Sequence, residues 1–418
     1  MAANILKNTF SSLHSKNFRY FWFGQCISVI GTWIQRTAQT WLVYQMTNSA
    51  LLVGVLAACQ FIPIIFLTLI AGTVIDRHPK RQILILTQFG FLLLGLAMTL
   101  LVFFKVVQYW QILIIALATG VLQSFDTPTR QSFVFELVGP KNLLNGISLN
   151  SSIFNLAKII GPSIAGILIT SVSMAACFLI NTLSFLAVLI GLFFIDNIPA
   201  NVKSKKATVL KDVKEGINYI VHHDSIKLSA ELMMIICTLN FNNNVIIPVY
   251  AKTVLHGGAQ TFATLQSAVG IGSLIAALVM GYLSRFGSNR KLYLGVSFGT
   301  VILQSSMIFV KAFSIALVIM ILIGFCNMVF LNQSNASFQY SIPNELRGRI
   351  MSVYVLLNQG STPIGSVYVG AIMDIFSGLF GFPACGLLAL ILLVPLTIKH
   401  KELISQWISG KEPLINAH

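Results

Sequence analysis

Two basic side chains, Arg36 and Lys158, stand inside long apolar stretches of this 418-residue chain. Charged residues within such stretches are costly to place in a membrane and are functional candidates by default. A guanidinium and an ammonium group both bind carboxylates and other anionic, oxygen-rich solutes. No acid in the same half of the sequence is placed to neutralise either cation, so the pair predicts a cavity for an anionic solute. The alternative is that helix carbonyls or side-chain amides satisfy each cation.

Polar side chains accompany these cations in the sequence. One helical face of the first apolar stretch carries, at offsets of four, seven and eleven residues, Ser28, Thr32, Gln35 and Gln39. Asn155 lies three residues before Lys158. A polar stripe of this kind is what a cavity-lining helix needs. The candidate aromatic neighbours of the solute are Trp33, Trp41, Tyr250 and Phe338, although Trp and Tyr near span ends more often mark the membrane interface.

The second half of the chain offers uncharged amides where the first half offers cations. They fall inside two apolar stretches, and the candidates for lining the cavity are Asn240, Asn243, Asn244, Asn327 and Asn335. Amides donate and accept hydrogen bonds, so they suit a polar ligand. Alternatively, they join helices to one another or open turns in the backbone.

Two acids, Asp126 and Glu231, are the candidate sites of proton coupling, because burial would let either carboxylate take up a proton. Asp126 is preferred, since an interfacial position would also explain Glu231. The seven histidines fall in loops or termini, so no buried imidazole relay is expected. The sequence has no Gly-x-x-x-x-Gly-Lys-Ser/Thr phosphate loop.

The remaining chemistry-bearing residues predict neither an enzyme nor a cofactor. The six cysteines lie in apolar stretches without a Cys-x-x-Cys pair, which indicates packing roles and no metal site. No cluster of His, Asp, Glu or Ser near one membrane face suggests a catalytic constellation.

The composition shows what must position these residues. Hydrophobic residues make up 56% of the chain and charged residues only 9%, against about 25% charged residues in soluble domains. Because a bilayer core needs about 20 apolar residues per helix, the sequence predicts an all-α membrane protein with twelve transmembrane helices. The predicted spans are 20–44, 51–74, 82–104, 109–137, 143–169, 174–195, 228–254, 262–283, 292–310, 314–341, 346–372 and 382–398.

The distribution of charge predicts the orientation. Most of the 27 basic residues fall in alternate loops, whereas the opposite loops hold only Lys105, Lys252 and Lys311. The positive-inside rule then places both termini in the cytoplasm and the chain in the inner (plasma) membrane as a multi-pass protein. The net charge of +15 therefore reflects topology, and no nucleic-acid partner is expected.

A long polar interruption divides six predicted spans from six. The expected domains are an N-terminal six-helix bundle at 1–195, a cytoplasmic linker at 196–227, and a C-terminal six-helix bundle with a cytoplasmic tail at 228–418. The two bundles are expected to be pseudo-repeats, because one set of residues recurs at a constant offset: Pro140, Leu143 and Asn155 match Pro343, Leu346 and Asn358.

The loop after the second span, Gly72–Arg81, carries one acid and several bases. It resembles the Gly-x-x-x-Asp-Arg-x-Gly-Arg-Lys signature of the major facilitator superfamily, which implies transport by alternating access. The resemblance implies that Asp76 contacts the start of helix eleven and latches the outward-open state. The bases either pair with Asp126 or Glu136 or simply obey the positive-inside rule. The candidate cytoplasmic gate residues are Gly72, Asp76, Arg77, Lys80, Arg81 and Arg347.

A second motif lies in the fifth span. Residues Ala157–Gly166, through Gly161, Pro162 and Gly166, resemble the Gly-x-x-x-Gly-Pro-x-x-Gly-Gly motif of drug and solute antiporters. The resemblance favours export, although ordinary small-residue packing would give a similar pattern. The arginine found in helix four of many proton-driven exporters would fall near Ala116, so that relay residue is not carried over.

Three further segments, Phe125–Gln131, Phe154–Lys158 and Leu346–Ser352, resemble the enterobactin-exporter-like branch, which includes macrolide efflux pumps. The branch itself does not name the substrate. Taken with the two buried cations, it leads us to expect a proton-coupled secondary exporter of a siderophore or similar anionic metabolite, with multidrug or macrolide efflux as the alternative. The expected partners are a small-molecule substrate, protons and the lipid bilayer. A monomer is expected, and an envelope-spanning efflux partner is left open.

Overall fold

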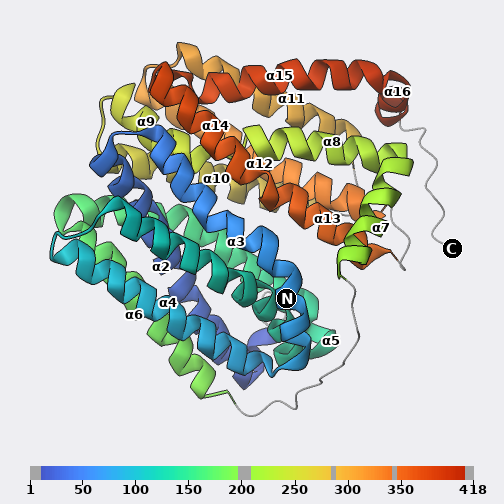
Figure 1. Ribbon diagram of the computed structural model, residues 1–418. Helices are drawn as coiled ribbons and strands as arrows, with labels where there is room; N and C mark the ends of the chain where they lie inside the picture. Colours follow the sequence, from blue (N-terminus) through green and yellow to red (C-terminus); the bar gives the residue numbers. More distant parts are fainter. Residues whose placement is uncertain (1–10, 196–208, 284–288, 341–345, 410–418) are drawn as a thin grey trace, which may run out of the picture. The chain divides into compact units, whose positions relative to one another are not determined.

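The computed structural model describes residues 11–195, 209–283, 289–340 and 346–409. Helices make up nearly all of these residues, and the described ranges contain no strand (Figure 1). The chain forms two compact units: one comprises Met1–Thr47 and Ile62–Lys206, and the other comprises Asn48–Phe61 and Ala207–His418. The unit boundaries place residues 48–61 with the second unit, which the predicted division at 1–195, 196–227 and 228–418 does not.

The first unit packs its helices around aromatic side chains. Its elements are η1 (Ser11–His14), α2 (Lys16–Thr47), the later part of α3 (Ala50–Arg77), α4 (Lys80–Phe103), α5 (Tyr109–Ser171) and α6 (Met174–Phe193). Helices α2 and α4 each pack against α5 and α6. Phe18, Phe21 and Phe133 lie in the buried cluster that joins them.

Helix α5 contains a kink at Gly139, where φ is +67° and ψ is 174°. Glycine adopts this left-handed φ without the steric cost that a Cβ would add. The following Pro140 has no amide hydrogen to donate to the preceding turn. The kink falls between the predicted spans 109–137 and 143–169, so α5 contains both of them.

The second unit contains more and shorter helices. Its elements are the first turns of α3, α7 (Val209–His222), α8 (Asp224–Leu239), α9 (Asn243–Thr253), α10 (Ala259–Leu283), α11 (Arg290–Ser306), η3 (Met307–Phe309), α12 (Phe313–Tyr340), α13 (Arg347–Gly360), α14 (Thr362–Ile375), η4 (Gly378–Phe380), α15 (Gly381–Lys399) and α16 (Lys401–Ser409). Helices α10 and α12 pack closely, because a Cβ on Gly272 would lie only 1.9 Å from the carbonyl oxygen of Ile321. Small residues permit such close backbone contact in membranes.

Two predicted spans are interrupted in the structure. The span 228–254 is divided between α8 and α9, and the side-chain amide of Asn242 donates to the carbonyl of Thr238 at 2.7 Å. This hydrogen bond satisfies a carbonyl that the end of α8 leaves without an intrahelical partner. The span 346–372 is divided between α13 and α14 at Ser361, two residues before Pro363.

The segment predicted as a cytoplasmic linker, 196–227, contains a helix for which no prediction was made. Helix α7 packs against α13, and the carboxylate of Glu215 pairs with Arg349. A Cβ on Gly216 would lie 2.8 Å from the carbonyl oxygen of Arg349. The absence of a side chain at Gly216 therefore allows α7 to approach α13.

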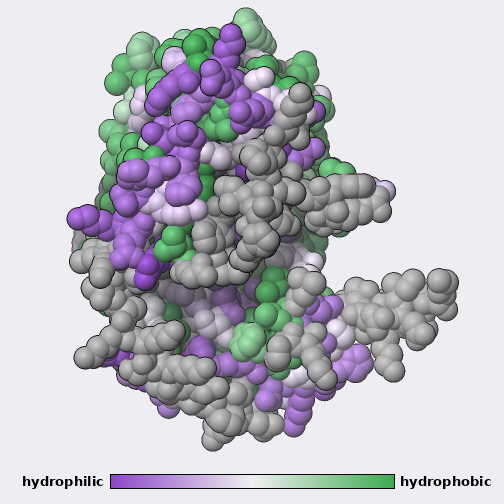
Figure 2. All heavy atoms as spheres, turned by 90° about the vertical axis from the view of Figure 1, so that its right-hand side faces the viewer, coloured by the Kyte–Doolittle hydropathy of each residue, from purple (hydrophilic) through white to green (hydrophobic). Residues whose placement is uncertain are grey.

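Ten described helical segments are long and apolar enough to cross a membrane. Helix α2 and the α13–α14 pair correspond to the two other predicted spans, so the all-α membrane fold with twelve transmembrane helices in two bundles is confirmed. In the upper part of Figure 2, which shows the second unit, hydrophilic side chains gather within the face toward the viewer and hydrophobic side chains show at its margins.

Candidate functional site

The two predicted cations lie against one aromatic ring in the first unit. The guanidinium carbon of Arg36 lies 5.7 Å from the ring centroid of Trp33, and Nζ of Lys158 lies 6.0 Å from it. Both distances fall within the range of cation–π attraction. Helix α2 supplies Trp33 and Arg36, and the second part of α5 supplies Lys158. We call these three residues, together with Gln123, the Trp33 cluster.

Gln123 is the amide-bearing member of the Trp33 cluster. Nη2 of Arg36 donates a hydrogen bond to Oε1 of Gln123 at 3.3 Å. The side chains of Trp33, Arg36 and Lys158 are half-buried. Among the described side chains, no carboxylate lies within ion-pair distance of either cation. The Trp33 cluster therefore keeps a net positive charge that a solute anion can meet.

The antiporter-like motif determines how closely α5 approaches α2 at this cluster. A Cβ added to Gly161 would lie 2.4 Å from the Cβ of Trp33, which is shorter than any ordinary carbon contact. Pro162 and Gly166 follow Gly161 in α5 and are buried. The close helix contact therefore lies at the candidate site, because the absence of a side chain at Gly161 lets α5 approach α2 and brings Lys158 to Trp33.

The other predicted residues of the first unit are Gln35, Asn155 and Gln39, of which the first two form hydrogen bonds within the unit. The amide of Asn181 in α6 donates to Oε1 of Gln35 at 2.6 Å. Asn155 donates to the carbonyl of Ser151 in its own helix at 3.0 Å. Gln39 is 3% exposed, and its Nε2 has no hydrogen-bond partner within the described part of the chain. Of these three predicted residues, Gln39 alone keeps a buried donor for another group.

The predicted amides of the second unit divide into paired and unpaired groups. Asn244 accepts a hydrogen bond from Gln266 at 2.8 Å, and Asn335 accepts one from Gln339. Within the described ranges, buried side-chain atoms without a hydrogen-bond partner occur on Asn240, Asn243 and Asn327. An unsatisfied buried polar group costs about 1 to 3 kcal/mol. These amides are therefore suited to a polar solute or to water.

Asp126 lies within a dense set of donors in the first unit. The residue is 3% exposed, and its Oδ1 accepts hydrogen bonds from Thr87 at 3.1 Å and Gln88 at 2.8 Å. Its Oδ2 pairs with Arg130, which also donates to Gln25. All of these contacts stabilise the ionised carboxylate. The sequence analysis did not identify Arg130 as the partner, although the two residues are four apart on one helix.

Glu231 lies beside a histidine in the second unit. Its Oε2 lies 3.1 Å from Nε2 of His400, and its Oε1 lies 3.7 Å from Nζ of Lys399. The two facing atoms of Glu231 and His400 lack hydrogen-bond geometry, so attraction between them requires a protonated imidazole. The side chain of His400 is only 11% exposed. His400 lies directly after α15, at a helix end as expected from the sequence, and its ring faces a candidate proton site.

The bases of the predicted gate make contacts within the first unit. Lys80 forms an ion pair with Glu136, which is one of the pairings expected from the sequence. Arg81 donates from Nε to the carbonyl of Leu192 at 2.8 Å and from Nη2 to that of Phe193 at 3.2 Å. A cation at the last carbonyls of α6 is favourable because they carry partial negative charge.

The rest of the predicted gate is described only in part. Gly72 and Arg77 are exposed. The side chains of Asp76 and Arg347 lie outside the described residues, and so does the start of the predicted latch partner at 341–345. The role of Asp76 as a latch therefore stays a prediction.

A carboxylate that the sequence analysis did not select caps a helix in the second unit. Asp374, near the end of α14, accepts hydrogen bonds from the backbone amides of Ala50 at 2.6 Å and Leu51 at 3.2 Å, and from the hydroxyl of Ser49. The first amides of a helix lack intrahelical acceptors and carry partial positive charge. Asp374 satisfies two of these donors at the start of α3.

The described residues contain no group of three or more His, Cys, Asp or Glu side chains that could hold a metal ion. Charged and amide side chains inside a two-bundle helical membrane fold define a transporter of the major facilitator type. The chain belongs to the transmembrane secretion effector family, whose model matches residues 7–413. The protein is accordingly a membrane transporter of an exporting family and not an enzyme.

Relatives of known name agree with this class. The staphyloferrin A transporter of Staphylococcus aureus is 25% identical over 375 residues, which cover 88% of this chain and 92% of the relative. Macrolide efflux protein A of Streptococcus pyogenes is 20% identical over 364 residues, which cover 85% and 89%. These relatives confirm the resemblance to a branch that holds both siderophore and macrolide transporters.

Solved transporter structures share the fold. The nucleoside transporter NupG superimposes with a TM-score of 0.71 at 10% identity, and the match covers 94% of this chain and 98% of NupG. At this identity the similarity shows the architecture alone.

Proposed function

We propose that this protein exports an anionic, oxygen-rich metabolite of the siderophore class across the inner membrane by alternating access. The observation that carries the proposal is the Trp33 cluster, in which two half-buried cations share one aromatic ring and no described carboxylate neutralises them. Membrane-embedded cations are costly, and those retained line substrate pathways or pair with an acid.

The chemistry of the cluster suits a solute with several carboxylate or catecholate oxygens. Arg36 offers a planar set of donors and Lys158 offers a compact ammonium, so together they match two separated anionic groups. Trp33 adds an apolar face for the carbon framework of such a solute. The similarity to the staphyloferrin A transporter supports the same substrate class.

Efflux of a macrolide or another neutral amphiphile is the second candidate. The observation that favours it is the set of buried uncharged amides in the second unit, of which Asn240 has neither side-chain atom paired within the described residues. Such amides would bind hydroxyl and carbonyl groups without requiring charge. The similarity to macrolide efflux protein A supports this alternative.

Coupling to proton entry is the proposed energy source, through Asp126 or Glu231. The donors around Asp126 all favour its charged form, so a proton there would have to break the pair with Arg130. Glu231 faces the imidazole of His400 and the ammonium of Lys399, so a second group that can carry a proton lies next to this carboxylate. This geometry supports Glu231 with His400 over Asp126, the site preferred from the sequence.

The proposed topology places both termini in the cytoplasm of a cell whose inner membrane holds the protein. The proposed conformational gate is the loop Gly72–Arg81, with Asp76 as the residue that distinguishes the two access states. The Lys80–Glu136 pair and the Arg81 contacts support a structured loop on the first unit. A single chain acting as a monomer is proposed to be sufficient for transport.

The experiment that tests the proposed function compares iron-starved cells with and without this protein by mass spectrometry of the spent medium and of the cell interior. The proposal predicts an iron-chelating compound that is lost from the medium and accumulates inside the deletion strain. Expression of the wild-type chain should restore export, and the variant with Arg36→Gln should not. Unchanged pools together with lowered macrolide tolerance would replace the first candidate by the second.

A further inference from the structure

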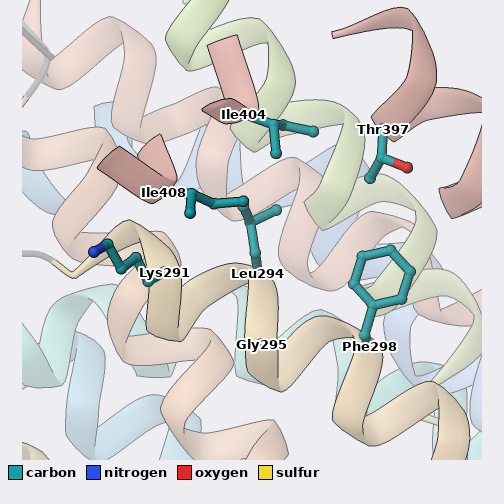
Figure 3. Close-up of a pocket in the computed structure, with 7 residues that line it drawn as sticks. All are labelled: Lys291, Leu294, Gly295, Phe298, Thr397, Ile404 and Ile408. Atoms are coloured by element: carbon teal, nitrogen blue, oxygen red, sulfur yellow. The ribbon is translucent and has the colours of Figure 1, made fainter. Parts of the chain in front are cut away.

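A groove lies along α11 in the second unit, with a volume of about 380 Å³. Helix α11 forms its floor through Lys291, Leu294, Gly295 and Phe298. Figure 3 shows these residues in sequence along the helix, with Lys291 at one end of the groove and Phe298 at the other. At a rise of 1.5 Å per residue, the two positions are about 10 Å apart along the helix.

The opposite wall comes from α16, which is fixed to α11 by an aromatic anchor. Trp407 of α16 is 2% exposed, and the guanidinium carbon of Arg290 lies 4.7 Å from its ring centroid. The ring centroid of Trp407 also lies 6.4 Å from that of Tyr293. This anchor holds the neighbouring positions Ile404 and Ile408, one helical turn apart, on the wall of the groove.

The lining has one charged end and one apolar end. Among the described residues that line the groove, Lys291 is the only charged one, and it is exposed. Thr397 of α15 adds a hydroxyl. Within the described residues, Lys291 makes no ion pair. Leu294, Phe298 and the two isoleucines of α16 supply apolar surface.

The charged and apolar ends of the groove lie at different depths in the membrane. The segment Arg290–Phe309 is a candidate span, so Lys291 lies at its end and Phe298 lies deeper within it. A ligand that fits must therefore place an anionic group at the membrane boundary and a hydrocarbon chain toward the interior. An anionic phospholipid has this arrangement, and basic side chains near the membrane surface attract such head groups.

We propose that this groove is a binding site for an anionic phospholipid, with the phosphate at Lys291 and one acyl chain along Leu294 and Phe298. The acyl chain gains little from leaving other lipid tails, because these are as apolar as the groove. Selectivity between lipids therefore comes from the contact of the head group with Lys291. The bound chain also fills the space between α11 and α16, so the lipid stabilises the attachment of α16.

Two substitutions separate the charge from the shape of the groove. Lys291→Gln removes the charge and keeps a polar side chain of similar length. Gly295→Leu fills the groove, and a Cβ at Gly295 meets no atom within 4 Å, so the added side chain has room. The matched controls are Lys311→Gln, at another exposed lysine of the same unit, and Gly281→Leu, where a Cβ also meets nothing within 4 Å.

The test is native mass spectrometry of the delipidated full-length chain, titrated with phosphatidylglycerol or with phosphatidylcholine of the same acyl chains. The wild type and both controls should retain phosphatidylglycerol preferentially, and Lys291→Gln should weaken its binding about five-fold. Gly295→Leu should weaken both lipids, and neither lipid should then raise its unfolding temperature.

Several results would overturn the proposal. Equal retention of the two lipids by the wild type, or unchanged retention by Lys291→Gln, would remove the head-group site. Competition by inorganic phosphate alone, with no effect of acyl chains, would make it a site for a free anion. A dimer abolished by Gly295→Leu would make the groove an interface between two copies of this chain.

Discussion

Gly161 of α5 lies so close to Trp33 of α2 that a Cβ on the glycine would be only 2.4 Å from the Cβ of the tryptophan. The two cations of the Trp33 cluster lie against the ring of the same tryptophan. A helix-packing position and a candidate substrate contact therefore share one residue. Any side chain at Gly161 must move α5 away from α2 or displace the ring.

The substitution Gly161→Ala should lower the free energy of unfolding by about 1 to 3 kcal/mol, the usual cost of an added methyl group in a close-packed site. It should also reduce export, because Lys158 moves with α5. Thermal unfolding in detergent and transport in vesicles measure the two effects. Gly299→Ala is the control, since a Cβ there would meet Cys326 Sγ at an ordinary 3.7 Å. Equal stability of the two variants would contradict the account.

The Asp126–Arg130 pair should behave as a buried pair whose partners depend on each other. Arg130→Gln alone leaves a buried carboxylate, so it should cost about 3 to 5 kcal/mol of stability. The double variant Asp126→Asn with Arg130→Gln should be more stable than Arg130→Gln, because no charge is then left unpaired. Unfolding of four chains, the wild type, Asp126→Asn, Arg130→Gln and the double variant, measures the coupling in a double-mutant cycle. Additive losses would show that the pair is not coupled.

The contact between Glu231 and His400 should make transport depend on pH. Glu231→Gln removes the carboxylate of this contact, so the pH dependence of export should become weaker. His400→Gln, which removes the other member of the contact, should have the same effect. The pH profile of transport in vesicles, at fixed substrate concentration, measures this. A profile unaltered by both substitutions would exclude this contact as the proton site.

Asp374 should hold the start of α3 in the helical state. Asp374→Asn weakens the bonds to the amides of Ala50 and Leu51, and loss of a cap typically costs about 0.5 to 2 kcal/mol. Hydrogen exchange of the segment 48–56 should therefore become faster, with little change elsewhere in the second unit. Ser49→Ala removes both the bond to Asp374 and the bond that the Ser49 hydroxyl accepts from the amide of Leu52 at 3.2 Å, so it should have an effect of similar size. Unchanged exchange in both variants would show that the cap does not stabilise α3.

The helical pattern of the sequence was enough to predict the spans, since length and hydropathy decide where a helix can cross a membrane. It also separated 109–137 from 143–169 at the position of the Gly139 kink. The break between α8 and α9 falls in the asparagine-rich segment 240–244, for which turns in the backbone were an open alternative. It was not predicted as a helix end, because the apolar residues on both sides led to one continuous span at 228–254. Helix α7, which packs against α13, was missed because the segment was read only as a polar linker. Its helical spacing of apolar residues, at Val209, Val213, Ile217 and Ile220, was present in the sequence.

The candidate site was predicted in its charges but not in its contacts. Arg36 and Lys158 are visible because charge is rare in apolar segments, whereas Gln123 became a partner only through the packing of α5 on α2. His400 was missed because a position at a helix end does not reveal which side chain faces it. A sequence read one span at a time cannot supply pairs between helices.

The central claim, that the Trp33 cluster selects an anionic cargo, is tested most directly by transport in vesicles reconstituted with the wild type, Arg36→Gln, Lys158→Gln and the control Lys311→Gln. For a carboxylate or catecholate siderophore, each cluster variant should raise KM about 10-fold or more, the loss expected for a charge-assisted hydrogen bond. Transport of a neutral macrolide, where it occurs, should be unaffected, and Lys311→Gln should match the wild type for both. Equal loss of anionic and neutral transport in the cluster variants would contradict the account, because the cations would then serve packing and not the recognition of charge.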